Sequence, residues 1–197
     1  MGLPLIFAAT AAGSALAYTA LTSGVRNKIA SIAGSVVPYQ REHAINKMVT
    51  QGRAFYPGYS GCGDLWNHVL DKIGAPNSWV NHDSEKRGMK WQPAVNISKP
   101  IGAAQKAGAW VKYVIGAYPK KGDLVLIGKE PSEMAHVFVV LSVDSDGMMK
   151  TAEYGQSNNA GGITYRRIDS SGRVVGPTGS VGRHVVGWID AEKIPLR

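Results

Sequence analysis

The chain has 197 residues, a single cysteine and a formal net charge of +8. This length predicts one main domain, and a hydrophobic content of 44% is sufficient for a packed core. One cysteine excludes an internal disulfide framework and the paired-cysteine motifs of zinc and redox sites. The positive charge favours an anionic partner, but the basic residues are scattered singly or in pairs, so we expect no specific nucleic-acid partner.

The N-terminal segment, residues 1–25, carries no charged side chain and is long enough for an apolar helix that spans a bilayer. Three interpretations remain open: a retained membrane anchor or uncleaved signal-like segment, a signal peptide that is removed, or a helix rich in small residues that packs inside a larger assembly. Membrane association is expected through residues 3–25. Residues 26–50 are expected to form a polar, partly helical connector, and residues 51–197 the main domain.

The sequence that follows Cys62 predicts an amphipathic helix. Apolar residues recur at helical spacing, and a glycine and a proline follow as a stop signal: Leu65, Trp66, Val69, Leu70, Ile73, Gly74 and Pro76. The intervening polar residues, Asn67 and His68 among them, are expected on the solvent side. Cys62 lies in the first turn, where the partial positive charge and free N–H groups of a helix N-terminus favour the thiolate. Taken alone, Cys62 is explained equally well as a small core residue.

Three later segments predict β-strands. A turn and a buried strand are expected over 118–128, "YPKKGDLVLIG", and further strands over 136–143, "HVFVVLSV", and 148–156, "MMKTAEYGQ". The intervening "DSDG" is typical of a hairpin turn. By contrast, the segment 91–119 is expected to mix turns with a short apolar stretch.

The predicted hairpin brings a histidine and a carboxylate together. Counted back from a pairing of Val143 with Met148, Phe138 faces Glu153, and His136 lies on the same face, diagonal to Glu153. A carboxylate in this position can accept the imidazole N–H and fix its tautomer. Cys62, His136 and Glu153 would then be the nucleophile, the base and the orienting group of thiol catalysis.

The other histidines do not suggest a metal. His43, His68, His82 and His184 lack the spacing of zinc ligands, and the glycines form no phosphate-binding loop. We therefore expect neither a metal site nor a cofactor. His184, at the start of "HVVGWID", is the main rival to His136 as the base.

The order of these elements resembles the papain-like cell-wall hydrolases of the CHAP family and its NlpC-type relatives. The matching parts are a cysteine that opens a helix, the turn and strand "PKKGDLVLIG", the strand that begins with histidine, a strand with an acidic residue, and the closing "VVGWIDAEKIP". The resemblance covers roughly residues 52–195 and is weak between 76 and 117. It implies that Cys62 is the nucleophile, His136 the base and Glu153 the orienting residue in cleavage of a peptidoglycan amide bond.

The chain departs from both families beside the cysteine. Gly61 stands where CHAP members usually have glutamine, and Gly-Cys-Gly replaces the Asp-Cys-Ser of NlpC-type members. The oxyanion donor is therefore left to Tyr59 or to the amide of Cys62. Gln156, which needs a bulge to reach the face of His136, is a further candidate for orienting the base or binding substrate.

The expected fold is α+β: a papain-like core in which the nucleophile-bearing helix packs on an antiparallel β-sheet, with the apolar N-terminal helix outside it. The expected protein is a peptidoglycan endopeptidase or amidase, membrane-associated or virion-associated, that acts on the cell envelope and takes part in a larger envelope or virion assembly. Two alternatives share the fold: a non-catalytic structural or wall-binding component, and an acyltransferase that acts on lipid.

Overall fold

The computed structural model describes residues 24–36, 62–81, 93–129, 136–156, 160–176 and 181–197. The helices are residues 24–36, α3 (Cys62–Ile73) and α4 (Pro93–Lys106), with short 3-10 turns η1 (Asn77–Trp79) and η4 (Ala191–Lys193). The strands are β1 (Trp110–Lys112), β2 (Leu124–Gly128), β3 (His136–Val143), β4 (Met149–Gln156), β5 (Ala160–Ile168), β6 (Arg173–Val175) and β7 (Val181–Ile189).

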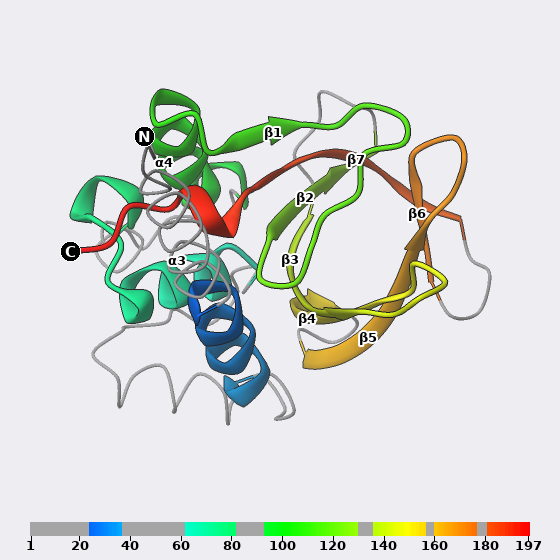
Figure 1. The fold of residues 1–197 in the computed structure, drawn as a ribbon, viewed down its shortest axis with the longest axis horizontal. Coiled ribbons are helices and arrows are strands. Elements are labelled where there is room, and N and C mark those ends of the chain that lie inside the picture. Colours follow the sequence, from blue (N-terminus) through cyan, green and yellow to red (C-terminus); the bar gives the residue numbers. More distant parts are fainter. Residues whose placement is uncertain (1–23, 37–61, 82–92, 130–135, 157–159, 177–180) are drawn as a thin grey trace, which may run out of the picture.

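The strands form a closed antiparallel barrel of six strands, β2 to β7. The sheet order is β1-β7-β2-β3-β4-β5-β6, and β6 also pairs with β7, which joins the two ends of the sheet. β1 pairs only with β7 and extends the sheet outside the ring. Figure 1 shows the barrel on the right and the helices on the left.

The expected papain-like α+β core, a helix on an antiparallel sheet, is wrong because the sheet closes on itself and three short helices accompany the barrel. The predicted strands at 118–128, 136–143 and 148–156 correspond to β2, β3 and β4. However, β5 and β6 were not predicted, and these two strands complete the ring between β4 and β7. A prediction that lacks β5 and β6 leaves the sheet open, because no strand then connects β4 to β7.

Two apolar clusters explain why β2 and β3 are apolar without alternation. One cluster receives side chains from all six barrel strands and therefore fills the barrel: Val125, Ile127, Phe138, Val140, Met149, Ile168, Val174, Val185 and Trp188. The other joins the helices to the outer face of the barrel, where Leu124 and Leu126 of β2 lie beside Val137 and Val139 of β3. Both strands are thus covered on two sides, which requires continuous apolar runs.

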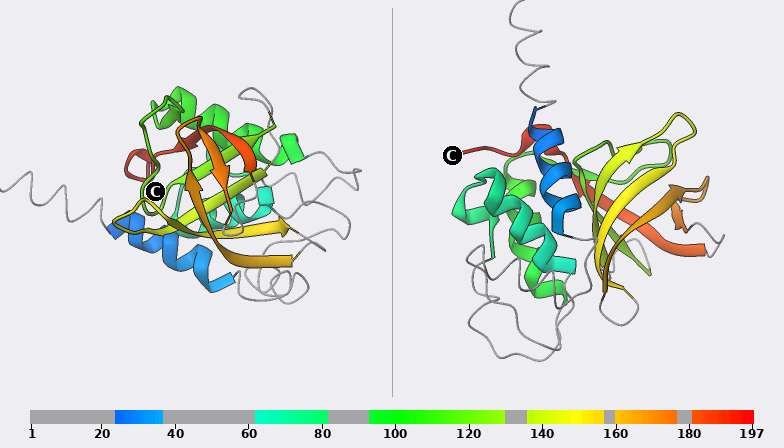
Figure 2. Two further views of the ribbon diagram at one scale, coloured as in Figure 1. Left: turned by 90° about the vertical axis from the view of Figure 1, so that its right-hand side faces the viewer. Right: turned by 90° about the horizontal axis from the view of Figure 1, so that it is seen from below.

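The helices gather on one side of the barrel, as the two views of Figure 2 show. The predicted helix after Cys62 is confirmed, and it ends before Gly74, whose φ of 87° suits a residue without a side chain. Asn67 and His68 were wrongly expected on the solvent side, because both are buried. α3 packs against α4 as well as against β3 and β4, so little of its surface is left for solvent.

Residues 93–106, expected as turns and a short apolar stretch, instead form the helix α4. Pro100 lies inside this helix, and Gly102 follows. Proline and glycine are the residues that most weaken a helical pattern, which explains why the sequence did not predict α4. Burial of Ile97, Ile101 and Ala104 in the helical cluster stabilises it in the fold.

The helix of residues 24–36, expected within the connector, contributes Ile29, Ala33 and Val36 to the same buried cluster. Residues 1–23, which include most of the expected apolar helix of residues 1–25, lie outside the described residues. Among the helices that are described, none has the length and apolarity needed to cross a bilayer.

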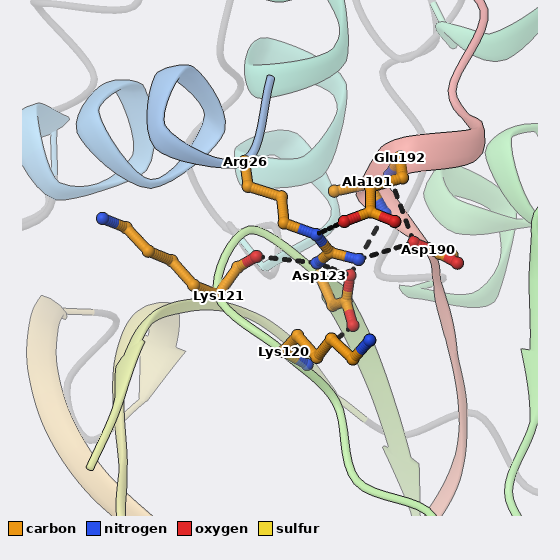
Figure 3. A network of polar contacts seen from close by, with 7 residues as sticks. All are labelled: Arg26, Lys120, Lys121, Asp123, Asp190, Ala191 and Glu192. Carbon is orange, nitrogen blue, oxygen red and sulfur yellow. Dashed lines mark hydrogen bonds and ion pairs between the residues drawn. The ribbon is translucent and has the colours of Figure 1, made fainter. Parts of the chain in front are cut away.

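Arg26 fixes this helix to the barrel through three carboxylates (Figure 3). Its guanidinium donates to Asp123 Oδ1 at 2.6 Å, to Asp190 Oδ1 at 2.7 Å and to Glu192 Oε1 at 2.7 Å. Asp123 also accepts the backbone N–H groups of Lys120 and Ala191. Burial raises the pKa of Asp123 to about 6, against the opposing influence of Arg26 and these donors. Through these contacts Arg26 links its own helix both to the turn before β2 and to η4.

Candidate active site

Three residues from three different elements meet in the candidate site. Cys62 is the first residue of α3, His136 is the first residue of β3, and Glu153 lies in β4. All three are buried, with exposed fractions of 1%, 3% and 1%. α3 packs on β3, and the indole of Trp66 donates to the carbonyl oxygen of Phe138 at 3.2 Å, which fixes the helix beside the strand that carries His136.

The pairing of β3 with β4 matches the predicted register near the site. Phe138 pairs with Glu153, as predicted. The register shifts between Val140 and Ser142, so that Val143 pairs with Met149 and not with Met148. The predicted register is therefore correct at Phe138 and Glu153. It is wrong by one residue between the register shift and the turn.

His136 and Glu153 are in direct contact. The imidazole Nε2 lies 3.0 Å from Glu153 Oε2, at hydrogen-bonding distance. This contact fixes the orientation of the ring and directs its second nitrogen, Nδ1, away from the carboxylate. The carboxylate is in the position that orients a general base in thiol and serine hydrolases.

Two further residues hold Glu153. Thr151 donates its hydroxyl to Glu153 Oε1 at 2.7 Å. Arg166 of β5 donates through Nε to Oε1 and through Nη2 to Oε2, the latter at 2.6 Å, and its guanidinium lies 5.9 Å from the ring centre of Phe138. Burial raises the pKa of Glu153, but hydrogen bonds and charge from Arg166 and His136 outweigh it and lower the pKa from 4.5 to about 2. Glu153 is therefore ionised throughout the physiological range.

His136 also contacts the thiol. Burial lowers the pKa of His136, but hydrogen bonds and charge attraction from Cys62 and Glu153 outweigh this effect, so the net pKa is raised above 6.5. Because Nε2 is engaged by Glu153, Nδ1 is the ring nitrogen that remains for the thiol. Cys62, His136, Glu153 and Arg166 thus form one continuous polar chain from the start of α3 to β5.

This chain can activate the cysteine. An imidazole with a raised pKa accepts the thiol proton readily, and the resulting imidazolium is stabilised by the carboxylate behind it. Cys62 also begins α3, where backbone N–H groups have no partner within the helix and can stabilise a developing oxyanion. The groups needed for covalent acyl transfer are therefore together at one place in the fold.

The remaining predicted site residues are not part of this group as described. Tyr59 lies outside the described residues, as do His43 and His82. Gln156 is the last residue of β4 and pairs with Ala160 across a register shift, but its side chain is not described. His184 lies on β7 opposite Gly128 and Arg173, and its Nε2 accepts from Arg173 Nε at 3.3 Å.

Within the described ranges, no group of three or more His, Cys, Asp or Glu side chains is arranged to hold a metal ion. The acidic residues that do converge, around Arg26, are neutralised by its guanidinium.

Arg166 is the site residue that the sequence did not reveal. Arg166 and Arg167 were interpreted as part of a scattered basic surface. Exposure alternates along 162–168 as in a half-buried strand, but the exposed residues include Ile163 and Tyr165. Apolar periodicity would therefore have placed these two residues inside and Arg166 on the solvent face, so its position beside Glu153 follows only from the observed pairing of β5 with β4.

Comparisons of the chain with protein-family models, characterised proteins and solved structures give no match.

Proposed function

We propose that the protein is a thiol hydrolase that cleaves an amide bond through a covalent acyl-enzyme. The observation that carries this proposal is the continuous polar chain from Cys62 through His136 and Glu153 to Arg166. Burial of a polar group lowers the free energy of unfolding unless the group is fully hydrogen-bonded. Packing of the core alone therefore does not explain why these polar side chains are buried together.

In the proposed mechanism His136 takes the proton from the sulfur of Cys62. The thiolate attacks the amide carbonyl, and the oxyanion accepts hydrogen bonds from N–H groups at the start of α3. His136 then gives the proton to the leaving amine. A water molecule, deprotonated by His136, attacks the thioester, releases the acid and regenerates the thiol.

We propose peptidoglycan as the substrate and the cell envelope as the place of action. The order of motifs along the chain resembles the CHAP and NlpC-type cell-wall hydrolases. The net charge of +8 suits an anionic wall polymer. The cleaved bond would lie within the stem peptide or between the peptide and the sugar.

The test is release of peptides and new amino groups from purified sacculi of several wall types. The full chain should release them, and Cys62→Ala and His136→Ala should each reduce the rate by about 10³-fold or more. His184→Ala is the matched control, because it removes another histidine from the barrel, and it should retain activity. Absence of release by the folded wild-type chain on every wall type would contradict the substrate. Equal rates for wild type and Cys62→Ala would contradict the mechanism.

The burial of Cys62 favours one alternative, a non-catalytic component in which the polar chain only holds α3 on the barrel. The two functions differ in the reactivity of the thiol. A catalytic Cys62 should react with iodoacetamide faster than a free thiol at pH 6, and His136→Ala should remove this advantage. A structural Cys62 should remain unmodified until the protein unfolds.

A further inference from the structure

The turn after β1 presents aliphatic side chains to solvent. Val114 is 62% exposed, Ile115 77% and Tyr118 56%. Among the described residues, Ile115 has the largest exposed fraction of any large hydrophobic side chain. In Figure 1 the loop that follows β1 lies on the barrel side of the molecule, away from the C-terminus. Exposed apolar side chains grouped in this way are typical of contact surfaces.

The turn is held firmly at its base. The N–H of Ala117 donates to the carbonyl oxygen of Val114 at 3.0 Å, and Gly116 between them has a φ of 89°, as a tight turn requires. Tyr113 donates its N–H to Val186 of β7 at 3.2 Å, and its side chain packs with Ala117 on the barrel cluster. Ile115 is therefore displayed by an ordered turn whose neighbours are fixed to the barrel.

Exposed cations lie on the strands around this turn. Lys112 ends β1, two residues before Val114. Arg173 of β6 follows Gly172, which adjoins the ring of Tyr113 at the base of the turn. Asp169 is the acidic group near Tyr113, and Arg173 counters its charge. The two cations beside the turn, Lys112 and Arg173, therefore outweigh the charge of Asp169.

We propose that this turn is a membrane-docking element that inserts Val114 and Ile115 into the interface of an anionic lipid bilayer. Aliphatic side chains at the tip, a tyrosine beside them and cations behind them match the requirements of interfacial binding. A second copy of the chain is disfavoured as the occupant, because two molecules of charge +8 repel each other. A soluble polyanion would engage the cations but would leave the aliphatic tip in water. The inference does not depend on the proposed hydrolase activity.

A fluorescent label in the turn tests its insertion into the bilayer directly, in the full chain. Ile115→Cys in a Cys62→Ala background is labelled with NBD and mixed with vesicles of phosphatidylcholine, with or without phosphatidylglycerol. Its emission should shift to the blue, and doxyl lipids should quench it, only when phosphatidylglycerol is present. The matched control is Leu196→Cys, an exposed apolar position next to the C-terminal residue. The C-terminus lies away from this turn in Figure 1, so the label at position 196 should remain in water. A label at position 115 that remains water-like, whether or not the chain binds vesicles, would overturn the proposal.

A second measurement separates insertion from simple charge attraction. The double variant Val114→Ser with Ile115→Ser should reduce quenching of a label placed at Tyr118→Cys by about tenfold at a fixed lipid concentration. Ile163→Ser, which removes an exposed isoleucine from β5, should leave it unchanged. Added salt should weaken docking in every variant. Unchanged quenching in the double variant, or a dimer that forms through this turn without lipid, would contradict the proposal.

Discussion

The carboxylate of Glu153 contacts two cationic groups, the guanidinium of Arg166 and the imidazolium of His136. Because its pKa of about 2 lies below the usual 4.5, the ionised carboxylate stabilises the fold above about pH 4.5. This stabilisation, roughly 3 kcal/mol, is lost as the pH falls from 4.5 towards 2. The raised pKa of His136 acts in the opposite sense, since its contribution is complete below pH 6.5 and is lost as the pH rises through the folded value.

Arg166 should therefore restrain the basicity of His136 as well as position Glu153. In Arg166→Gln the carboxylate is no longer shared and a neighbouring positive charge is removed, so the pKa of His136 should rise further. NMR titration of the histidine ring above pH 6 would measure this change. Arg167→Gln, which alters the exposed neighbour, is the control and should leave the titration unchanged. A fall in the pKa of His136 in Arg166→Gln would contradict this role.

At the scale of single residues, the sequence predicted that His136 lies near Glu153. It did not predict Arg166, which holds Glu153 in place. The hairpin turn and the alternation of side chains were enough to place His136 near Glu153, because both are local properties of adjacent strands. Arg166 reaches the same carboxylate from β5, which pairs with β4 in one register from Met149 to Glu153. Two apolar residues of β5, Ile163 and Tyr165, face solvent, so apolar periodicity would place Arg166 on the wrong side of this strand.

At the scale of elements, Gly122 provides the contact through which the helix of residues 24–36 docks on the barrel. A Cβ at this position would lie 2.8 Å from Arg26 Cα and 2.9 Å from the Arg26 carbonyl oxygen. Gly122 also has a φ of 87°, which disfavours any other residue. The "PKKGD" segment was interpreted as a turn before a strand, and its glycine and aspartate in fact contact a helix nearly a hundred residues earlier.

Gly122→Ala should therefore lower the free energy of unfolding by about 2–4 kcal/mol, through backbone strain and displacement of the helix. Gly147→Ala is a matched control, because Gly147 has a similar φ of 79° but has no atom within 4 Å of the added methyl group. It should cost about 1 kcal/mol. Urea denaturation of both variants would measure the difference. Equal losses would show that Gly122 matters only for its backbone conformation.

At the scale of the whole molecule, closure of the barrel depends on a short pairing between β6 and β7. Arg173 pairs with His184, and Val175 pairs with Val181. Gly182 lies between these pairs, and a Cβ there would collide with the carbonyl oxygen of Val174. No local pattern predicts such a closure, because it follows from the twist of the whole sheet and the length of every strand.

Gly182→Ala should open the barrel at this point and destabilise the protein by about 1–3 kcal/mol. Amide hydrogen exchange should accelerate first in β6 and in the start of β7, while β3 and β4 stay protected. Gly162→Ala on β5, where the added methyl group meets no atom within 4 Å, is the control and should leave the exchange of β6 unchanged. Uniform acceleration across all strands would show that the barrel opens only by global unfolding.

The position of β7 between β1, β2 and β6 has a consequence for synthesis on the ribosome. β7 is translated after the other six strands, so the edge of β2 that it covers stays unpaired until then. That edge belongs to a strand of leucine, valine and isoleucine, the composition most prone to pair with other nascent chains. Productive folding therefore depends on how quickly β7 follows, and a translational pause between residues 129 and 181 should increase aggregation in the cell.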